Sequence, residues 1–301
     1  MKEFSLSQQC ALVALDGLSS IHNSMAKRAA LRSIAAAQVL ESILSDDTGM
    51  DASLFEKRLL EELVKIKEQN KRQAKQLEKE ITLQLKEDGV LEEVADILGC
   101  DMYYYTADVS IKAYRSDRET VTSIIEGLRA EILEEGEITL ECACLLWCFR
   151  EARCIQELFS KEEQMLVKDR MVRLSGENEL YRILWQTEFR NGLESFSIGF
   201  LQSKSKAFEN PYLEGMNAAF PFLERRQAIF IDFVIFGTTV AGRRAAVESF
   251  LSERGHYVEE IKNGTETLLR IDNICYRVFP KTVTMKVPIQ GVLLLPVSIY
   301  W

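Results

Sequence analysis

The chain has 301 residues, of which 47% are apolar and 28% are charged, and its formal net charge is −9. This balance is typical of a soluble globular protein with one large or two ordinary domains, and it excludes a disordered chain. An acidic chain also lacks the positive charge that attracts nucleic acid, so we expect no nucleic-acid partner.

No export signal or membrane anchor is expected. The N-terminal segment lacks a basic stretch followed by an apolar core, because Asp16 and several polar residues interrupt it early. The longest apolar run, residues 228–242, is about 15 residues long and contains Asp232, whereas a spanning helix needs about 20. We therefore expect a cytoplasmic protein whose cysteines are reduced and buried.

Two mostly apolar helices are predicted within residues 4–44, separated by a polar segment at 19–24. The second, ALRSIAAAQVLESIL at 30–44, is rich in alanine, which permits close packing between helices. Its Arg32 is surrounded in sequence by small and apolar residues. Such an arginine either extends to the surface or meets a buried carboxylate, and anion binding is the remaining alternative.

A long, exposed helix is predicted over about residues 52–87, where charged residues are dense and apolar residues are sparse. The apolar positions follow a 3–4 repeat, but Lys67 and Asn70 occupy two of them, so a solvated helix is favoured over a coiled coil. Residues 89–98 are predicted to form another short helix, and residues 102–114 receive no assignment.

Two well-marked helices follow. Apolar residues recur at helical spacing between Val121 and Ile132, which predicts an amphipathic helix that ends at Gly136. Thr139 is placed to cap the next helix, and Glu141 lies in its first turn, where a carboxylate is favoured by the helix dipole.

Four cysteines cluster along this next helix, namely Cys142, Cys144, Cys148 and Cys154. Structural zinc sites usually present pairs of ligands on turns, so buried thiols in a helix are favoured over a metal site. The chain has only two histidines, His22 and His256, so few residues are available for a histidine-based metal site or a catalytic triad. We expect no metal, no cofactor and no enzymatic activity.

The last quarter of the chain differs in charge. Residues 1–224 carry 27 Lys/Arg and 39 Asp/Glu, a net charge of −12, whereas residues 225–301 carry 10 and 7, a net charge of +3. In this last part, residues 228–236 predict a buried strand and residues 240–255 predict a helix closed by Gly255.

More strands complete this C-terminal part. Asn263-Gly264 predicts a hairpin turn between two strands, and the segments NICYRVF, TVTMKV and GVLLLPVSIYW predict further strands. We therefore predict a small α+β module over residues 225–301, with one helix on a mostly antiparallel sheet. It resembles no family that we recognise.

Gly237 and Gly242 have the spacing of a phosphate-binding loop between a strand and a helix. The residues that follow are Arg243 and Arg244, where a nucleotide loop needs Lys and then Ser or Thr, so a plain turn is favoured. An anion held by the helix start and the two arginines is the other alternative.

Residues 121–173 resemble the Golgi phosphoprotein 3 family, in which an amphipathic helix and a glycine turn precede an apolar helix and then a charged helix. The corresponding segments are LEEGEIT at 133–139, CLLWCF at 144–149 and LFSKEEQMLVKDR at 158–170. Residues 4–21 and 30–44 resemble the first two helices of that family, so the resemblance covers roughly residues 1–190. It implies a fold that is mainly α, with a helical domain of Golgi phosphoprotein 3 type at 1–224.

The resemblance also implies a ligand site. Members of that family in eukaryotes bind phosphatidylinositol 4-phosphate through an aromatic residue near the second helix, an arginine within it and two basic residues spaced by three. Arg32 matches the helix arginine, whereas the aromatic position falls near His22 and the two basic positions fall on Thr122 and Ile125. Arg115 and Arg118 lie upstream with the same spacing. The candidate residues for an anionic headgroup are Arg32, His22, Arg28, Arg115 and Arg118.

Two properties limit what the resemblance implies. The family's β-hairpin after the second helix has no obvious counterpart here, because the long charged helix is predicted at that place. For Lys27, Arg28, Arg115 and Arg118, a solvated face is the simpler interpretation.

We expect a non-enzymatic binding or adaptor protein, peripheral to a membrane through an anionic, phosphoinositide-like lipid headgroup. The alternative is a cytoplasmic protein-interaction scaffold that binds protein partners and no lipid.

Overall fold

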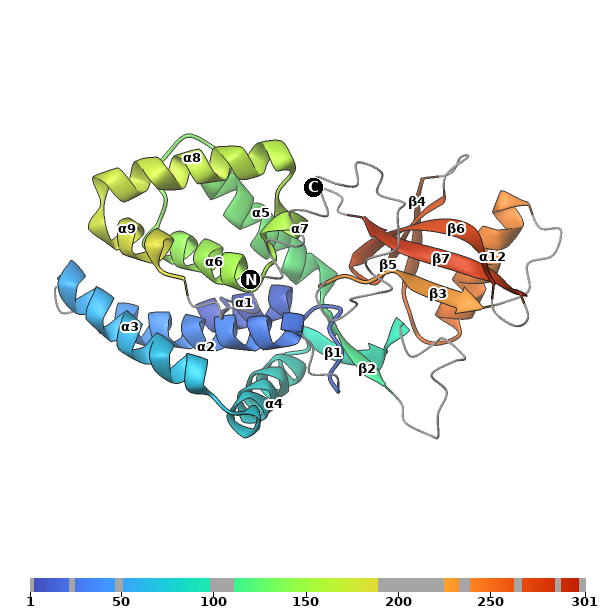
Figure 1. Ribbon diagram of the computed structural model, residues 1–301, viewed down its shortest axis with the longest axis horizontal. Helices are drawn as coiled ribbons and strands as arrows, with labels where there is room; N and C mark the ends of the chain where they lie inside the picture. The colour runs from blue at the N-terminus through green and yellow to red at the C-terminus, as the bar shows by residue number, and fades with distance from the viewer. Residues whose placement is uncertain are drawn as a thin grey trace.

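The computed structural model describes residues 3–21, 25–46, 51–97, 111–188, 225–232, 239–262, 267–284 and 288–297. Within these ranges a group of helices is followed by a module built on a larger sheet, and the two lie side by side along the long axis of the molecule (Figure 1). The predicted fold class, mainly α with a small α+β module, is confirmed at this level. The family type of the helical domain stays a prediction.

The helical domain begins with α1 (Leu6–Ala14), α2 (Met25–Ser45), α3 (Ala52–Glu68) and α4 (Lys71–Glu87). Its later helices are α5 (Arg118–Leu133), α6 (Leu140–Glu151), α7 (Ile155–Leu158), α8 (Lys161–Glu177) and α9 (Glu179–Gln186). Helix α6 contacts α1, α2, α5 and α9, and its Trp147 and Phe149 are fully buried. A helix that is apolar on every side needs such cover, so α6 forms the centre of the domain.

The predictions for α5 and α6 are confirmed. Helix α5 buries Val121, Ile125, Leu128 and Ile132 on one face. The chain then turns through Gly136, and the Thr139 side chain accepts a hydrogen bond of 3.1 Å from the backbone nitrogen of Cys142 at the start of α6. Local spacing and capping were therefore sufficient to locate both helices.

The single helix predicted over residues 52–87 is wrong, because α3 and α4 are separate. The Asn70 side chain accepts hydrogen bonds of 2.9 Å from Arg72 N and 3.0 Å from Gln73 N, and the Gln73 side chain accepts one from Asn70 N. This reciprocal capping box begins a new helix. Neither helix is fully solvated, since Leu59 on α3 and Leu85 on α4 are both buried completely.

Replacing Asn70 by alanine is expected to lower the free energy of unfolding by about 1 kcal/mol, because two backbone N–H groups at the start of α4 lose their acceptor. Urea denaturation followed by far-UV circular dichroism would measure the loss. Asn70→Asp is the matched control, since it keeps an acceptor oxygen and should cost much less. Equal losses in the two variants would contradict the capping role.

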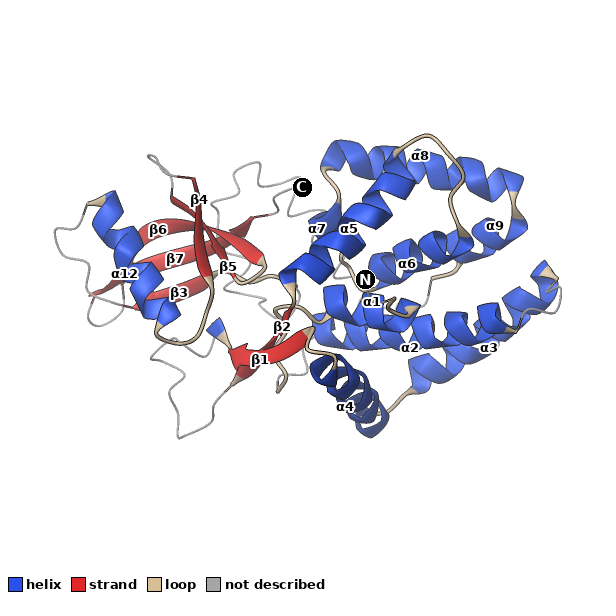
Figure 2. Cartoon of the chain, turned by 180° about the vertical axis from the view of Figure 1, so that it is seen from behind, coloured by secondary structure: helices blue, strands red, loops and turns tan. Residues whose placement is uncertain are grey.

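The short helix predicted at residues 89–98 is also wrong. Gly89 takes a positive φ of 74° after α4, and strand β1 (Leu91–Ala95) then pairs antiparallel with β2 (Lys112–Ser116). The partner strand lies partly in the segment that received no assignment, so the pairing was not visible in the sequence. The pair lies between the helices and the larger sheet (Figure 2), where no hairpin was expected.

The C-terminal module contains one antiparallel sheet. Its elements are β3 (Ile229–Asp232), α12 (Val240–Ser252), β4 (Val258–Lys262), β5 (Thr267–Ile271), β6 (Ile274–Thr284) and β7 (Pro288–Val297). The strand order is β3-β7-β6-β5-β4 and every neighbouring pair is antiparallel, which confirms the predicted module. The segments NICYRVF and TVTMKV contribute to one strand, β6, which continues through Pro280 opposite Val292.

Some of the predicted C-terminal features fall outside the described residues. The turn at Asn263-Gly264 is one of them, although the flanking strands β4 and β5 do pair antiparallel. Gly237 is another. Helix α12 ends before Gly255, which has a positive φ of 84°, as the prediction required.

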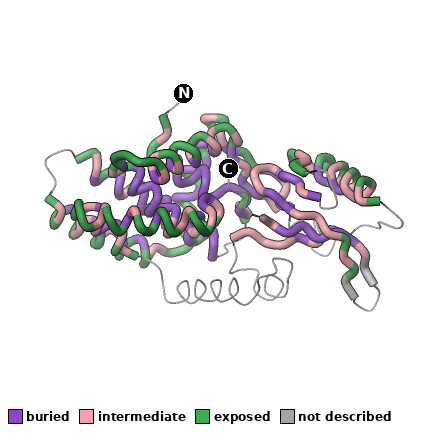
Figure 3. The backbone as a smooth tube through the Cα atoms, turned by 90° about the horizontal axis from the view of Figure 1, so that it is seen from above, coloured by how far each residue is buried: buried purple, intermediate pink, exposed green. Residues whose placement is uncertain are grey.

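The two parts of the molecule have separate apolar cores (Figure 3). In the module, Val247 and Leu251 of α12 pack on Ile231, Leu269 and Val292 of the sheet. The same cluster includes Ile97, which follows β1. A residue from the helical part of the molecule therefore contributes to the apolar core of the module.

Candidate functional site

The start of α2 and strand β2 meet at one corner of the helical domain. Gly17 N donates to Tyr114 O over 2.8 Å, Tyr114 N donates to Leu18 O over 3.1 Å, and Ser20 N donates to Lys112 O over 2.8 Å. The chain that leads into α2 therefore lies beside β2. We call this region, made of residues 17–21, the first two turns of α2 and strand β2, the α2 corner.

A solvated face was expected for Lys27, and this expectation is wrong. The residue lies in the α2 corner and is only 4% exposed. Its Nζ lies 2.6 Å from Oε1 of Glu78 on α4 and donates to Ser20 O over 2.7 Å. The Tyr114 hydroxyl donates to the same carboxylate oxygen over 2.7 Å. Burial and the Glu78 carboxylate raise the pKa of Tyr114 well above its usual value. This buried group ties together α2, α4 and β2.

Arg28 and Arg32 are less buried than Lys27. Arg28 is exposed, Arg32 is partly exposed, and their spacing of one turn places them on the same face of α2. The first turn of α2 contains no acidic residue. A cation at this end of a helix opposes the helix dipole, so an anion bound here would be favoured twice, by the dipole and by the arginines. His22 lies outside the described residues.

Arg115 and Arg118 face the C-terminal module. Arg115 Nε lies 2.8 Å from Glu92, and its Nη1 lies 2.7 Å from Asp272 and donates to Gly255 O over 3.0 Å. Arg118 Nη1 lies 2.7 Å from Glu259 on β4. Both guanidinium groups are thus paired with carboxylates across the two parts of the molecule. The structure does not group these two arginines with Arg28 and Arg32 as one headgroup site.

Asp272 is the centre of this contact. It has a left-handed φ of 53°, and it accepts hydrogen bonds from Arg115 and from Tyr257 N. His256 Nδ1 lies 2.8 Å from its other oxygen. Burial alone would raise the pKa of Asp272, but His256 and Arg115 outweigh this effect and hold the pKa below its usual value.

A second set of contacts lies at the end of α1. Arg225 donates to Ala14 O over 2.6 Å and to Val13 O over 2.8 Å, so it caps the helix. The Nε atoms of Arg225 and Arg226 lie 3.0 Å and 3.3 Å from the carboxylate of Glu157. Both arginines lie a few residues before the start of β3.

Asp16 and Gly17 complete this region. Asp16 Oδ1 accepts hydrogen bonds of 3.0 Å from both Ser116 N and Asn273 Nδ2. Gly17 has a φ of 65°, in the left-handed region that strains other residues, and a Cβ atom there would also lie 2.3 Å from Arg226 Nη1, so glycine is strongly favoured. We define the junction as the following residues: Asp16, Arg115, Arg118, Glu157, Arg225, Arg226, Glu259, Asp272 and Asn273.

The cysteines are placed largely as predicted. Cys142, Cys144 and Cys148 lie on α6, but Cys154 lies beyond it, at the start of α7, because α6 ends at Glu151. All four are buried, and burial raises the pKa of Cys144 and of Cys154 to about 12. Thiols with such pKa values are poor nucleophiles. In the part of the chain that the structure describes, no three His, Cys, Asp or Glu side chains are grouped as a metal site requires.

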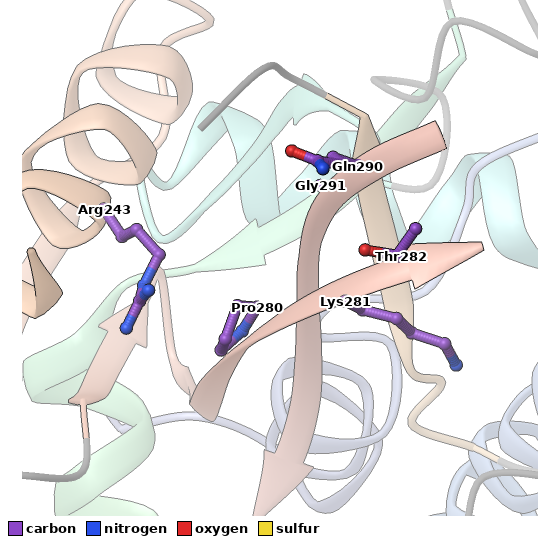
Figure 4. Close-up of a pocket in the computed structure, with 6 residues that line it drawn as sticks. All are labelled: Arg243, Pro280, Lys281, Thr282, Gln290 and Gly291. Atoms are coloured by element: carbon purple, nitrogen blue, oxygen red, sulfur yellow. The ribbon is translucent and has the colours of Figure 1, made fainter. Parts of the chain in front are cut away.

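A pocket of about 200 Å³ lies in the C-terminal module, between α12 and the ribbon formed by β6 and β7 (Figure 4). Its described lining residues are Arg243, Pro280, Lys281, Thr282, Gln290 and Gly291. The arginine pair at 243–244 had been noted in the sequence. Thr282 and Gln290 were missed, because only the strand register, which places them opposite each other, brings them to the pocket.

Comparison with models of protein families, with curated proteins and with solved structures found no match. The resemblance to the Golgi phosphoprotein 3 family is therefore untested and stays a prediction. Among the helices that the structure describes, none combines the length and apolar character needed to cross a membrane.

Proposed function

We propose that this chain is a non-enzymatic binding or adaptor protein that recognises an anionic lipid headgroup at the α2 corner. The observation that carries the proposal is the placement of Arg28 and Arg32. Arg28 is exposed in the first turn of a 21-residue helix, Arg32 follows on the same face, and no acidic residue lies in that turn. Arg32 is also the residue at which the resemblance to the Golgi phosphoprotein 3 family is matched.

The surroundings of these arginines suit a membrane surface. Ile21 of the α2 corner has 53% of its surface exposed, and an exposed apolar side chain can enter the boundary between headgroups and acyl chains. The nearby charge of Lys27 is already neutralised by Glu78, so it does not add to the attraction. Because residues 1–224 have a net charge of −12, recognition has to be local and not a general attraction to anionic lipid.

Two groups of polar side chains among the described residues support a non-enzymatic role. The charged residues of the junction pair with one another or with the backbone, and the thiols on α6 are buried with raised pKa values. An enzyme needs an acid, a base or a nucleophile that can reach a substrate. The junction residues instead make contacts between the two parts of the molecule.

Replacing both Arg28 and Arg32 by alanine is expected to weaken binding to anionic vesicles by roughly thirtyfold, since each basic residue near such a surface contributes about a factor of five. Co-sedimentation with vesicles of phosphatidylcholine, phosphatidylglycerol or phosphatidylinositol 4-phosphate would measure this. The wild-type chain should sediment with anionic vesicles only, and the phosphoinositide should bind more tightly than phosphatidylglycerol at equal charge.

Lys168→Ala/Arg173→Ala is the matched control, because it removes two exposed cations from α8. This variant should bind vesicles as the wild type does. If both double variants weaken binding equally, the attraction is general and the proposed site is wrong. If the wild type binds no vesicle at all, lipid recognition is excluded.

A protein-interaction scaffold is the second candidate, and one observation favours it. Helix α8 exposes Met165, Leu166 and Val172 by 62%, 60% and 55%, although it buries Val167 and Met171. Large apolar side chains gathered on one outer face are typical of surfaces that bind other proteins. Absence of vesicle binding in the experiment above would leave this function as the better one.

A further inference from the structure

We propose that the pocket between α12 and the β6–β7 ribbon binds a phosphate monoester group. This site is separate from the α2 corner and does not depend on the function proposed there. Its elements come from the C-terminal module, which carries a net charge of +3 in an acidic chain. The described lining residues include two cations and no carboxylate.

The strand register explains how the pocket is built. Val292 and Leu294 of β7 point to the core beneath α12, and Pro280 lies opposite Val292. Because side chains alternate along a strand, Thr282 and Gln290 lie on this same face, one step beyond the core. Gly291 lies beside them, and a Cβ atom there would lie 2.3 Å from Ile231 O, so glycine is needed for β3 and β7 to approach.

Three side chains supply hydrogen-bond donors at this place. Arg243 extends from α12 toward Pro280, while Thr282 and Gln290 come from facing positions of β6 and β7 (Figure 4). Together they offer a guanidinium fork, a hydroxyl and an amide NH₂. A phosphate monoester has three terminal oxygen atoms and up to two negative charges, whereas a carboxylate has two oxygen atoms and one charge, so donors and cations that line one pocket favour phosphate.

The charge of Lys281 adds to this site from a different direction. Its side chain points away from Arg243, so it adds positive charge near the pocket and is not counted among the three donors (Figure 4). Burial lowers the pKa of Lys281, which means that its charged form has lost favourable contact with water.

The backbone at the start of α12 does not form this site. Thr239 already accepts a hydrogen bond of 3.1 Å from Gly242 N and caps the helix. The next residue, Arg244, pairs with Glu260 on β4 over 2.9 Å, so the two neighbouring arginines have different roles. With a volume of about 200 Å³, the pocket is smaller than the roughly 300–1,000 Å³ of pockets for drug-sized ligands. It therefore suits a phosphate group and not a whole nucleotide.

The test is a thermal-shift and calorimetric titration of the full chain with inorganic phosphate, with glycerol 3-phosphate and, at equal ionic strength, with acetate. We expect saturable binding of the two phosphates and none of acetate. Arg243→Ala should weaken phosphate binding by roughly tenfold or more, because it removes a charged hydrogen bond. Arg244→Ala, the matched control, should leave phosphate binding unchanged.

Two further measurements test the same proposal by other means. Thr282→Val/Gln290→Leu removes the neutral donors and should also weaken binding, even if Arg243→Ala alters folding. Vesicles with phosphatidic acid distinguish a lipid source of the phosphate from a soluble one: sedimentation that depends on Arg243 indicates a lipid, and its absence indicates a soluble ligand. Lack of saturable phosphate binding by the wild type, or equal binding by Arg243→Ala, would overturn the proposal.

Discussion

Replacing Lys27 by methionine is expected to lower the free energy of unfolding by about 3–5 kcal/mol. The side chain of Glu78 is only 10% exposed, and without the Lys27 ammonium at 2.6 Å its carboxylate would be a buried charge with no counterion. The Tyr114 hydroxyl would remain as a donor, but a neutral hydrogen bond does not neutralise the charge. Urea denaturation at pH 7, followed by far-UV circular dichroism, would measure the loss.

A double-mutant cycle identifies the cause. In Lys27→Met/Glu78→Gln neither partner is charged, and the glutamine can still accept from Tyr114, so much of the lost stability should return. Lys79→Met, an exposed neighbour of Glu78 on α4, should change stability by less than about 0.5 kcal/mol. The single variants Lys27→Met and Glu78→Gln complete the cycle. If their losses of stability simply add in the double variant, the buried pair is not the source of the stability.

The helices that could be predicted from the sequence are those determined by local signals. Apolar spacing between Val121 and Ile132 located α5, and Thr139 located the start of α6, because caps and periodicity act within a few residues. The break between α3 and α4 is also local. It was missed because Asn70 was interpreted as a weak seam position and not as a cap.

Pairings between distant segments could not be predicted. Strand β1 forms because β2 is available beside it, and a Glu-rich segment adopts a strand when such a partner is present. In the same way, nothing near Lys27 in the sequence indicates that Glu78 lies beside it. A lysine in the first turn of a helix is usually solvated, so the simpler interpretation failed here.

The candidate sites show the same limit. Arg32 was selected through the family resemblance, and helical spacing alone places Arg28 on the same face of α2, whereas their role in binding a headgroup stays a prediction. Arg115 and Arg118 have a suggestive spacing, yet their carboxylate partners Asp272 and Glu259 come from the other end of the chain. Spacing within one segment indicates which side chains share a face, but it does not indicate which of them are already paired.

Replacing Glu157 by glutamine is expected to lower the free energy of unfolding at pH 7 by about 3 kcal/mol, since Arg225 and Arg226 would lose their shared carboxylate in the junction. Burial raises the pKa of Glu157, but the two arginines outweigh burial and hold the pKa below its ordinary value of 4.5. The folded state therefore binds the proton less readily than the unfolded state does.

The direction of this pKa shift determines how the contribution of Glu157 to the free energy of unfolding changes with pH. The contribution of Glu157 is fully present above its ordinary pKa and is lost as the pH falls through the lower folded value. Asp16 acts in the opposite direction, because burial raises its pKa, so the pH profile of the wild type alone would mix the two effects. The difference between wild type and Glu157→Gln isolates Glu157.

Urea denaturation of both proteins between pH 3 and pH 8 would measure that difference. It should be constant at neutral pH and should shrink on acidification, because a protonated Glu157 and a glutamine are both neutral. Glu177→Gln, at an exposed position at the end of α8, is the matched control and should cost less than about 0.5 kcal/mol at pH 7. A loss that stays undiminished at the acidic end would mean that Glu157 stabilises the junction through its shape and not its charge.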